Sequence, residues 1–157
     1  MTPTATARAV RLAPEQVLPA MPVHFVAGLI GLPETRDFDL VPFGPLNVFG
    51  LLRARPPAQT TGVRRLELVV AAPGALWPDF GVIVEDADAA ALGLRSAEDA
   101  AILVVVTQAQ PVEASTANLY APVVLNRHDG RALQVVPLKP ESESPFSSRT
   151  PLPLNTA

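Results

Sequence analysis

Apolar residues occur along this chain in short runs, and prolines, glycines and polar turn residues separate the runs. The runs are rich in Val and Leu and have the length of strands, which favours β-structure over helix. Strands are expected at Val23–Phe25, Phe38–Val41, Val48–Leu52, Leu66–Ala71, Phe80–Val84, Ile102–Thr107, Asn118–Leu125 (interrupted near Pro122) and Leu133–Val136, with a short edge strand at Ala9–Leu12. Their number and spacing predict a mainly β fold, an antiparallel sandwich or barrel.

Only two stretches indicate helix. Asp86–Leu92 begins with acidic residues, which suit a helix N-terminus, and Gly93 can end it in the left-handed conformation. Ser96 and Asp99 have the spacing of a capping box, which predicts one helical turn before the strand at Ile102. The chain has 18 prolines among its 157 residues, and they leave little room for longer helices.

Polar residues enter the strand-like stretch 115–126, which reads S-T-A-N-L-Y-A-P-V-V-L-N. The strand pattern places Leu119, Val123 and Leu125 in the core. Thr116 and Asn118 are then expected to hydrogen-bond backbone groups of a neighbouring loop. Hairpin architecture therefore explains these polar side chains, and contact with a partner is the alternative.

The end of the same stretch predicts a tight hairpin. Pro122 cannot donate to a strand ladder, so it suits an edge or a bulge, and such an edge would be open to a partner. Asn126 tolerates the left-handed conformation and can start the following turn. The pair Asp129-Gly130 in that turn is a hairpin signal.

The length of the chain is most simply that of a single domain. Residues 1–20 are rich in Thr, Ala and Pro and are expected to be flexible, and residues 21–139 hold most of the predicted strands. Residues 140–157 form a Pro/Ser-rich tail. Its low apolar content predicts that burial does not offset its ordering entropy. Even so, Phe146, Arg149 and Leu152 could dock on a surface.

Charge and composition exclude several functions. The net charge is −3 and no long Lys/Arg run exists, so the electrostatic footprint of a nucleic-acid binder is missing. The chain has no cysteine, which excludes disulfides and zinc–cysteine sites, and its two histidines have no ligand spacing. No metal or cofactor is predicted. No run approaches the roughly 20 apolar residues that span a bilayer, and no signal-peptide pattern is present, so a cytoplasmic location is expected.

A catalytic interpretation finds little support. The sequence contains no G-x-S-x-G, no H-E-x-x-H and no paired-carboxylate motif. A hydrolase whose site assembles around Ser115 and His128 is the weakest hypothesis, since only the fold could bring these residues together. The chain is expected not to be an enzyme.

Two further stretches each allow a structural and a functional interpretation. Trp77 to Phe80, W-P-D-F, is either a core plug or an exposed interface anchor. The acidic stretch at Glu85 and Asp86 is either a solvated helix face or a surface that steers a basic partner.

Several motifs, in order and at similar spacing, resemble those of the flagellar assembly factor FliW family over residues 23 to 152. The longest is the T-A-N-L-Y-A-P-V-V-L-N string. The others are Phe25–Leu32 (resembling F-x-x-G-L-x-G-F), Phe38–Leu40, Pro78–Phe80 (P-D-Y, with Phe in place of Tyr), Val104–Thr107 (V-x-V-T) and Phe146–Leu152 (Y-x-x-R-x-P-L).

This resemblance implies a small antiparallel β-barrel-like domain that is not an enzyme and is a monomer when free. It implies two protein partners, flagellin and the translational repressor CsrA. By binding CsrA, the protein is expected to relieve the repression of flagellin mRNA without contacting RNA itself. The residues we expect at the partner interface are Trp77, Asp79, Phe80, Glu85, Asp86, Thr116, Asn118, Tyr120, Pro122, Phe146 and Arg149. The alternative is a β-barrel binding or structural module with another protein or small-molecule partner.

Overall fold

The computed structural model of the chain describes residues 10–12, 17–27, 29, 35–44, 46–55, 66–137 and 140–153, and for residues 10–12 it describes the backbone alone. The strands are β1 Val10–Leu12, β2 Met21–Phe25, β3 Asp37–Phe43, β4 Phe49–Ala54, β5 Glu67–Ala71, β6 Val82–Val84, β7 Ala100–Thr107, β8 Thr116–Ala117, β9 Val123–Asn126, β10 Arg131–Gln134 and β11 Thr150–Pro151. The helices are α1 Pro73–Leu76 and α2 Asp86–Leu92, and single 3-10 turns are η1 Ala97–Asp99, η2 Val112–Ala114 and η3 Glu141–Glu143.

Seven of these strands close into a barrel. Around the ring the order is β7-β5-β4-β3-β2-β10-β9, and β9 pairs back onto β7. The long strand β7 makes closure possible, because its first half pairs with β9 and its second half pairs with β5. The predicted mainly β, barrel-like fold is confirmed. One pairing, β10 with β2, is parallel, whereas the sequence analysis expected antiparallel neighbours.

Each predicted strand region contains a strand, but one prediction is half wrong. Residues 118–122 form no strand, because Asn118 turns the chain there, and the ladder resumes only at β9. The predicted helix is confirmed as α2, which ends at Gly93 with φ 69°. The capping box is confirmed at η1, where the Asp99 carboxylate accepts a hydrogen bond from the Ser96 amide at 3.0 Å. The short helix α1 was not predicted.

The barrel encloses one apolar core, which we call the inner core. Phe25 and Phe38 meet edge to face inside it, with ring centroids 5.5 Å apart. Its buried residues are Leu18, Val23, Phe25, Leu29, Phe38, Leu40, Leu52, Ala54, Val70, Ala72, Ala101, Leu103, Val123, Leu125 and Ala132. Burial of a side chain of the size of Leu or Phe contributes about 1.5–3 kcal/mol, so this cluster is a main source of stability.

A second apolar cluster, the outer core, lies on the outside of β7 beneath a covering layer. Its buried residues are Ala71, Phe80, Val82, Val84, Leu92, Ala100, Ile102, Val104, Val106, Ala117, Leu119, Val124, Val135 and Leu152. Strand β7 serves both cores because alternate side chains of a strand point to opposite faces. Ile102 is fully buried in the outer core, and its neighbour Leu103 is buried in the inner core.

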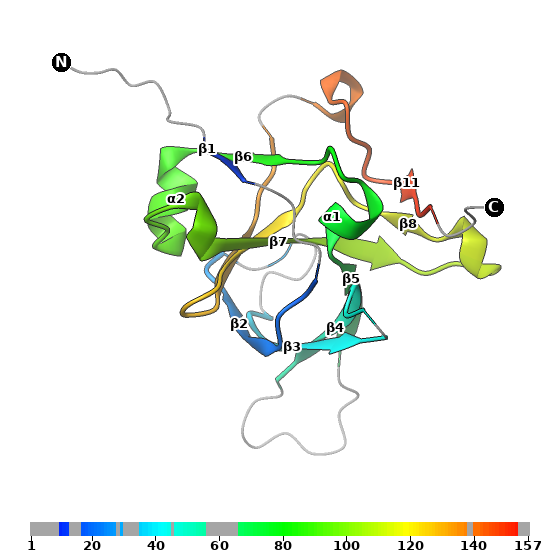
Figure 1. The fold of residues 1–157 in the computed structure, drawn as a ribbon, viewed down its shortest axis with the longest axis horizontal. Coiled ribbons are helices and arrows are strands. Elements are labelled where there is room, and N and C mark those ends of the chain that lie inside the picture. The colour runs from blue at the N-terminus through cyan, green and yellow to red at the C-terminus, as the bar shows by residue number, and fades with distance from the viewer. Residues whose placement is uncertain are drawn as a thin grey trace.

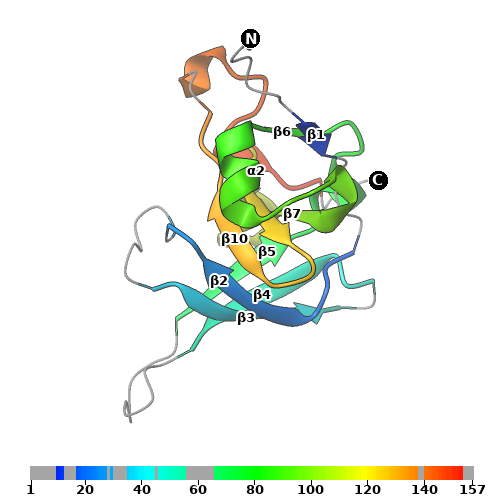
Figure 2. The same ribbon diagram turned by 90° about the vertical axis from the view of Figure 1, so that its left-hand side faces the viewer.

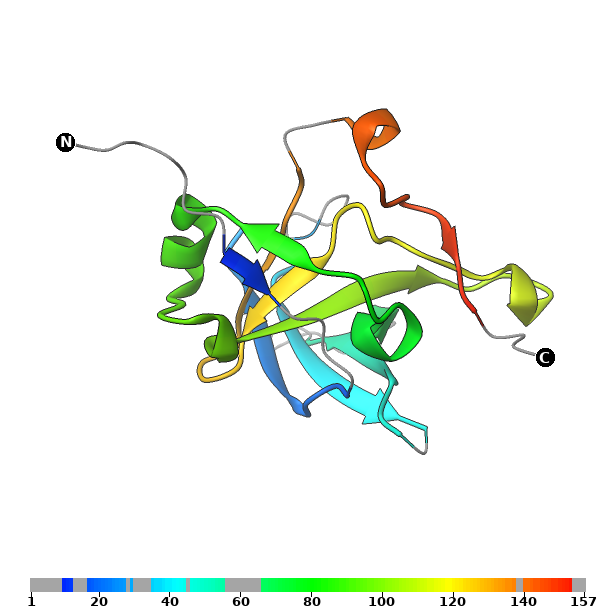
Figure 3. The same cartoon turned by 45° about the horizontal axis from the view of Figure 1, so that its top comes forward.

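The covering layer consists of α1, β6, α2 and the C-terminal residues 140–153. Figure 1 shows α2, β6 and α1 on the side of the barrel away from β3 and β4, and Figure 2 shows the same separation from the side. β1 pairs antiparallel with β6 in a separate two-stranded sheet, which Figure 3 shows outside the barrel. Most of the residues that the sequence analysis expected at a partner interface lie in the covering layer or next to it.

Two expectations concern residues that are only partly described. The expected flexible segment 1–20 lies outside the described residues for 1–9 and 13–16. Of its described part, Leu18 is buried in the inner core and its amide donates to the Asn47 carbonyl at 2.8 Å. In the Phe25–Leu32 motif, Gly28 and residues 30–32 lie outside the described residues.

Candidate partner-binding surface

Three segments that are far apart in the sequence meet at the outer core. They are residues 77–80, which follow α1, residues 116–122, which include β8, and residues 141–153 with η3 and β11. Phe80, Leu119 and Leu152 are buried together in the outer core, and Trp77 and Phe146 pack against it half-buried. The structure therefore brings together the motif residues of three predicted interface segments. We call this the three-segment surface.

An aromatic contact joins the first segment to the last. The rings of Phe80 and Phe146 meet edge to face with centroids 4.8 Å apart. Phe80 is only 2% exposed, whereas Phe146 is half-buried. Trp77 is half-buried and Asp79 is exposed, so the core-plug interpretation describes Phe80 and the surface interpretation describes Asp79.

Backbone and amide hydrogen bonds hold the middle segment. The backbone N–H of Asn118 donates to the Val105 carbonyl of β7 at 2.9 Å, and the side-chain Oδ1 of Asn118 accepts from the backbone N–H of Ala121 at 2.9 Å. This second bond closes a turn that points the chain back into β9. Thr116 and Tyr120 are half-buried at the rim of the surface.

The prediction that Pro122 creates an open edge is wrong. Pro122 is buried, and its carbonyl accepts a hydrogen bond from the Val135 amide at 2.8 Å. The strand that follows it, β9, pairs with β10 on one side and with β7 on the other. Proline is tolerated here because it precedes the ladder and no partner strand requires its missing N–H.

The C-terminal segment packs on the barrel, contrary to the expectation from its composition. β11 pairs antiparallel with β8, and Leu152 is 8% exposed. The Leu119 amide donates to the Ser147 carbonyl at 3.0 Å, and the Leu152 amide donates to the Ser115 carbonyl at 3.3 Å. Few apolar residues suffice because the outer core supplies the surface on which they pack.

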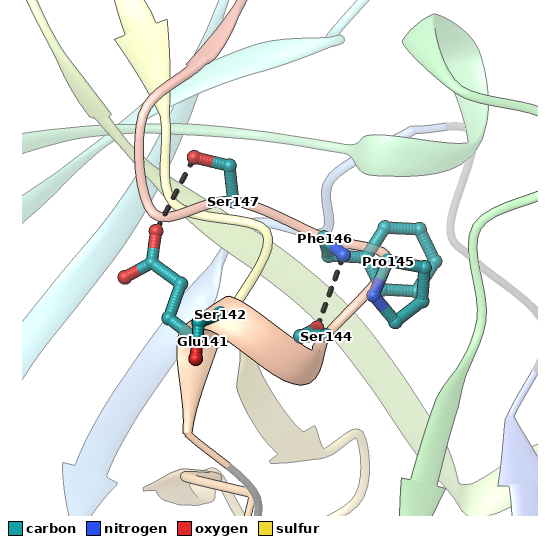
Figure 4. A pocket seen from close by; sticks show the side chains of 6 residues that line it. All are labelled: Glu141, Ser142, Ser144, Pro145, Phe146 and Ser147. Atoms are coloured by element: carbon teal, nitrogen blue, oxygen red, sulfur yellow. Dashed lines mark hydrogen bonds between the residues drawn. The ribbon is translucent and has the colours of Figure 1, made fainter.

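A carboxylate organises the turn before this segment. Glu141 Oε2 accepts hydrogen bonds from the Ser148 amide at 2.8 Å, from the Ser148 hydroxyl at 3.0 Å and from the Ser147 hydroxyl at 3.3 Å. The bond from the Ser148 amide is the main reason why the pKa of Glu141 lies below its usual value. Figure 4 shows Glu141 and Ser147 on one side of this turn and the rings of Pro145 and Phe146 on the other.

An open depression of about 380 Å³ lies at this turn and could receive a side chain of a partner. Its lining residues are Glu141, Ser142, Ser144, Pro145, Phe146 and Ser147. Sequence reasoning named Phe146 but missed Glu141, because Glu141 bonds Ser147 and Ser148 six and seven residues later, which no local turn pattern indicates.

The acidic residues Glu85 and Asp86 do not belong to the three-segment surface. They follow β6 at the start of α2, an element that Figure 1 shows, and the side chains of both are exposed. Other exposed carboxylates lie on the segments themselves or next to them: Asp79, Glu113, Glu141 and Glu143. The single exposed guanidinium of the last segment, Arg149, is close enough to Glu141 to help lower its pKa.

The geometry contradicts the hydrolase hypothesis. Ser115 directly precedes β8, which pairs with β7 at Thr107, whereas His128 follows β9, which pairs with β7 at Ala100. These two ends of β7 are about 23 Å apart at 3.3 Å per residue. Ser115 is 1% exposed and its hydroxyl accepts from the Ala109 amide, while His128 instead contacts the Asp99 carboxylate at 2.9 Å.

Sequence reasoning also missed an apolar hairpin on the far side of the barrel. Val41 and Phe43 of β3 and Leu46 in the turn to β4 are 38%, 45% and 71% exposed. Phe43 stacks on Phe49 with ring centroids 6.2 Å apart. The apolar run V-P-F-G-P-L around a turn was the available signal.

Within the described parts of the chain, no group of three or more His, Asp or Glu side chains is placed to hold a metal ion. None of the helices in the same parts has the length and hydropathy needed to cross a membrane.

The fold defines the chain as a small closed β-barrel protein, and its candidate site is a surface built from three segments. The profile of the FliW protein family matches residues 4–151. The chain therefore belongs to the FliW family.

Individual relatives agree with this assignment. The chain is 35% identical over 138 residues to the flagellar assembly factor FliW of Syntrophotalea carbinolica, which covers 86% of this chain and 89% of the relative. It is 32% identical over 114 residues to that of Bacillus licheniformis, covering 73% and 76% of the two chains. A crystal structure of the flagellar assembly factor FliW superimposes with a TM-score of 0.68 over 90% of this chain and 96% of that one, at 23% identity, which supports the fold.

Proposed function

We propose that this protein is a non-enzymatic flagellar assembly factor of the cytoplasm that binds flagellin and antagonises a CsrA-type translational repressor by protein contact. The observation that carries the proposal is the convergence of three family-like motifs on one surface of a FliW-family barrel. On these segments the exposed charges of Asp79 and Arg149 lie within three residues along the chain of the half-buried aromatics Trp77 and Phe146. Half-buried aromatics with a charged rim are typical of interface hot spots.

The charge of this surface favours a basic partner. Asp79, Glu113 and Glu143 are exposed on or beside the three segments, and Arg149 is the exposed cation of the last one. Complementary charge raises the association rate and suppresses wrong partners more than it adds affinity. Glu85 and Asp86 would add to the negative charge from outside the three segments, and salt would weaken their effect because the Debye length is about 8 Å at physiological ionic strength.

The expected interface residues divide into two roles. Phe80 and Pro122 are buried, so they hold the surface in shape. Trp77, Asp79, Thr116, Asn118, Tyr120, Phe146 and Arg149 retain exposed atoms and are the residues that would touch a partner.

Arg149→Ala tests this assignment. The substitution is expected to weaken binding to at least one of the two partners about tenfold, because a guanidinium at an interface often contributes about 1.4 kcal/mol or more. Calorimetric titration against flagellin and the CsrA-type regulator of the same organism measures the effect.

The matched control is Arg36→Ala, which removes an exposed guanidinium next to β3, away from the three segments. It is expected to leave both affinities unchanged. Equal affinities for the two variants would contradict the location of the interface. If the folded wild-type chain bound neither protein, the module with a different partner would be favoured instead.

A further inference from the structure

The C-terminal segment covers part of the three-segment surface. It pairs with β8 through β11, it contacts Phe80 through Phe146, and its Ser147 carbonyl accepts a hydrogen bond from the Leu119 amide. We propose that the surface beneath this segment is an exchangeable strand-binding groove. An extended segment of a protein partner enters the groove when residues 146–152 leave, and Phe146 and Arg149 of the released segment then contact the partner beside the groove. The entry of a partner segment rests on the proposed function, whereas the exchange of the C-terminal segment does not.

The barrel does not need the C-terminal segment to close. Its seven-stranded ring runs through β7, β5, β4, β3, β2, β10 and β9 and includes neither β8 nor β11. In the described part of the chain, β11 pairs only with β8, at the outer end of the strand order. Release of the segment therefore breaks no pairing of the ring, and it can open without global unfolding.

The segment is held by few anchors. The ladder between β11 and β8 has two residue pairs, Thr150 with Ala117 and Pro151 with Thr116. The buried or half-buried apolar anchors of residues 140–153 are Phe146, against Phe80, and Leu152. Glu141, Glu143, Ser147, Arg149 and Pro151 are exposed. So small an interface is expected to open often compared with the barrel.

The bound segment shows what the groove accepts. It lies antiparallel to β8, inserts an aromatic ring and, six positions later, an aliphatic side chain, and exposes polar residues between them. The amide of Leu119 needs a carbonyl partner, which Ser147 supplies. A free strand edge beside apolar surface binds extended peptides by strand addition. The occupant we assign is therefore an extended protein segment with an aromatic and an aliphatic residue at this spacing.

Hydrogen exchange on the wild-type chain tests the opening without any partner. The amide of Asn118 donates to β7 and the amide of its neighbour Leu119 donates to the C-terminal segment. We expect Leu119 and Leu152 to exchange at least tenfold faster than Asn118 and Val135, whose acceptors belong to the barrel side. Equal rates for all four amides would overturn the proposal, since the segment would then open only with the whole fold.

A peptide tests the groove itself. In the full chain, Phe146→Ala with Leu152→Ala is expected to release the segment, and a fluorescent peptide of residues 144–153 then binds at least tenfold tighter than it binds the wild type. The same peptide carrying both alanines is expected not to bind. The control Phe43→Ala with Leu46→Ala removes an aromatic and a leucine from the far hairpin and should create no peptide binding. The proposal is overturned if the folded Phe146→Ala, Leu152→Ala variant does not bind the peptide. It is also overturned if this variant binds the peptide with both alanines as tightly as the natural peptide.

An engineered disulfide tests whether a partner segment replaces the C-terminal segment. Thr116 and Pro151 are directly opposite, and such pairs lie close to disulfide spacing. Because the chain has no cysteine, Thr116→Cys with Pro151→Cys allows only this disulfide within one molecule, and the oxidised monomer is separated from disulfide-linked dimers before titration. Oxidation is expected to weaken binding of flagellin or the CsrA-type regulator at least tenfold relative to the same variant reduced. Unchanged affinity overturns the exchange with a partner. Binding to neither protein in the wild type refutes the proposed function, and the peptide result still decides the groove.

Discussion

Two asparagines of the T-A-N-L-Y-A-P-V-V-L-N string, Asn118 and Asn126, have different structural roles. Asn126 is 3% exposed; its Nδ2 donates to the Leu92 carbonyl at the end of α2 at 2.8 Å, and its Oδ1 accepts from the His128 amide at 2.8 Å. It thus ties α2 to the turn between β9 and β10. Asn118 is half-buried, and its side chain closes only its own turn. The sequence analysis predicted Asn126 as the start of a turn, which is confirmed, although Asn126 does not have the left-handed conformation on which the prediction rested. Its bond to α2 connects residues that no local pattern relates.

Asn126→Ala is therefore expected to lower the free energy of unfolding by about 2–4 kcal/mol, because it leaves a carbonyl and an amide without partners in a buried place. Asn118→Ala, its matched control, removes one hydrogen bond at the surface and should cost about 1 kcal/mol or less. Urea unfolding followed by circular dichroism measures both. Similar losses for the two variants would mean that burial does not distinguish these amides.

At the scale of elements, the hairpin of β9 and β10 is fixed by what surrounds its turn. The turn ends at Gly130, whose φ is 83°, and the Gly130 carbonyl accepts from the His24 amide at 2.8 Å. The parallel pairing of β10 with β2 starts at the next residue, Arg131. The Asp129-Gly130 pair predicted the turn, and its second task, allowing close approach to β2, became visible only in three dimensions.

Gly130→Ala is expected to destabilise the protein more than Gly93→Ala. Both glycines have positive φ, which costs an alanine about 1–2 kcal/mol. A methyl group at Gly93 would meet the guanidinium of Arg131, the movable end of a long side chain, whereas at Gly130 it would meet the backbone carbonyl of Pro22. We expect a loss of about 1–2 kcal/mol for Gly93→Ala and about 3 kcal/mol or more for Gly130→Ala in urea unfolding. The reverse order would show that β2 gives way more readily than Arg131.

At the scale of the whole molecule, the local signals and the barrel-like fold were predicted correctly, whereas the parallel pairing within the barrel was not predicted. α2 with its Gly93 end, the capping box at Ser96 and the hairpin at Asp129 are each encoded within a few neighbouring residues. The pairing of β10 with β2 depends on residues that only the closed barrel brings together. For the same reason Pro122 was predicted at an edge, although β9 has neighbours on both sides.

The candidate surface shows the same division. Sequence motifs named its residues, but only the fold showed that Phe146 packs on Phe80 and that the C-terminal segment is paired with β8. Composition underestimated that segment because composition counts the apolar residues a segment contributes. It does not count the apolar surface of the outer core on which those residues pack.

The two cores share β7, so they are expected to unfold as one unit. Trp77, the only tryptophan, packs against the outer core, and its fluorescence reports on the covering layer, whereas circular dichroism reports mainly on the barrel strands. Because Ile102 and Leu103 are adjacent on β7 and fill different cores, loss of either packing disturbs the strand that both cores need. Both probes should therefore give one urea midpoint, and Ile102→Ala and Leu103→Ala should each lower the unfolding free energy by about 2–5 kcal/mol in both signals. A tryptophan transition at lower urea, moved by Ile102→Ala alone, would instead mean that the covering layer melts from an intact barrel.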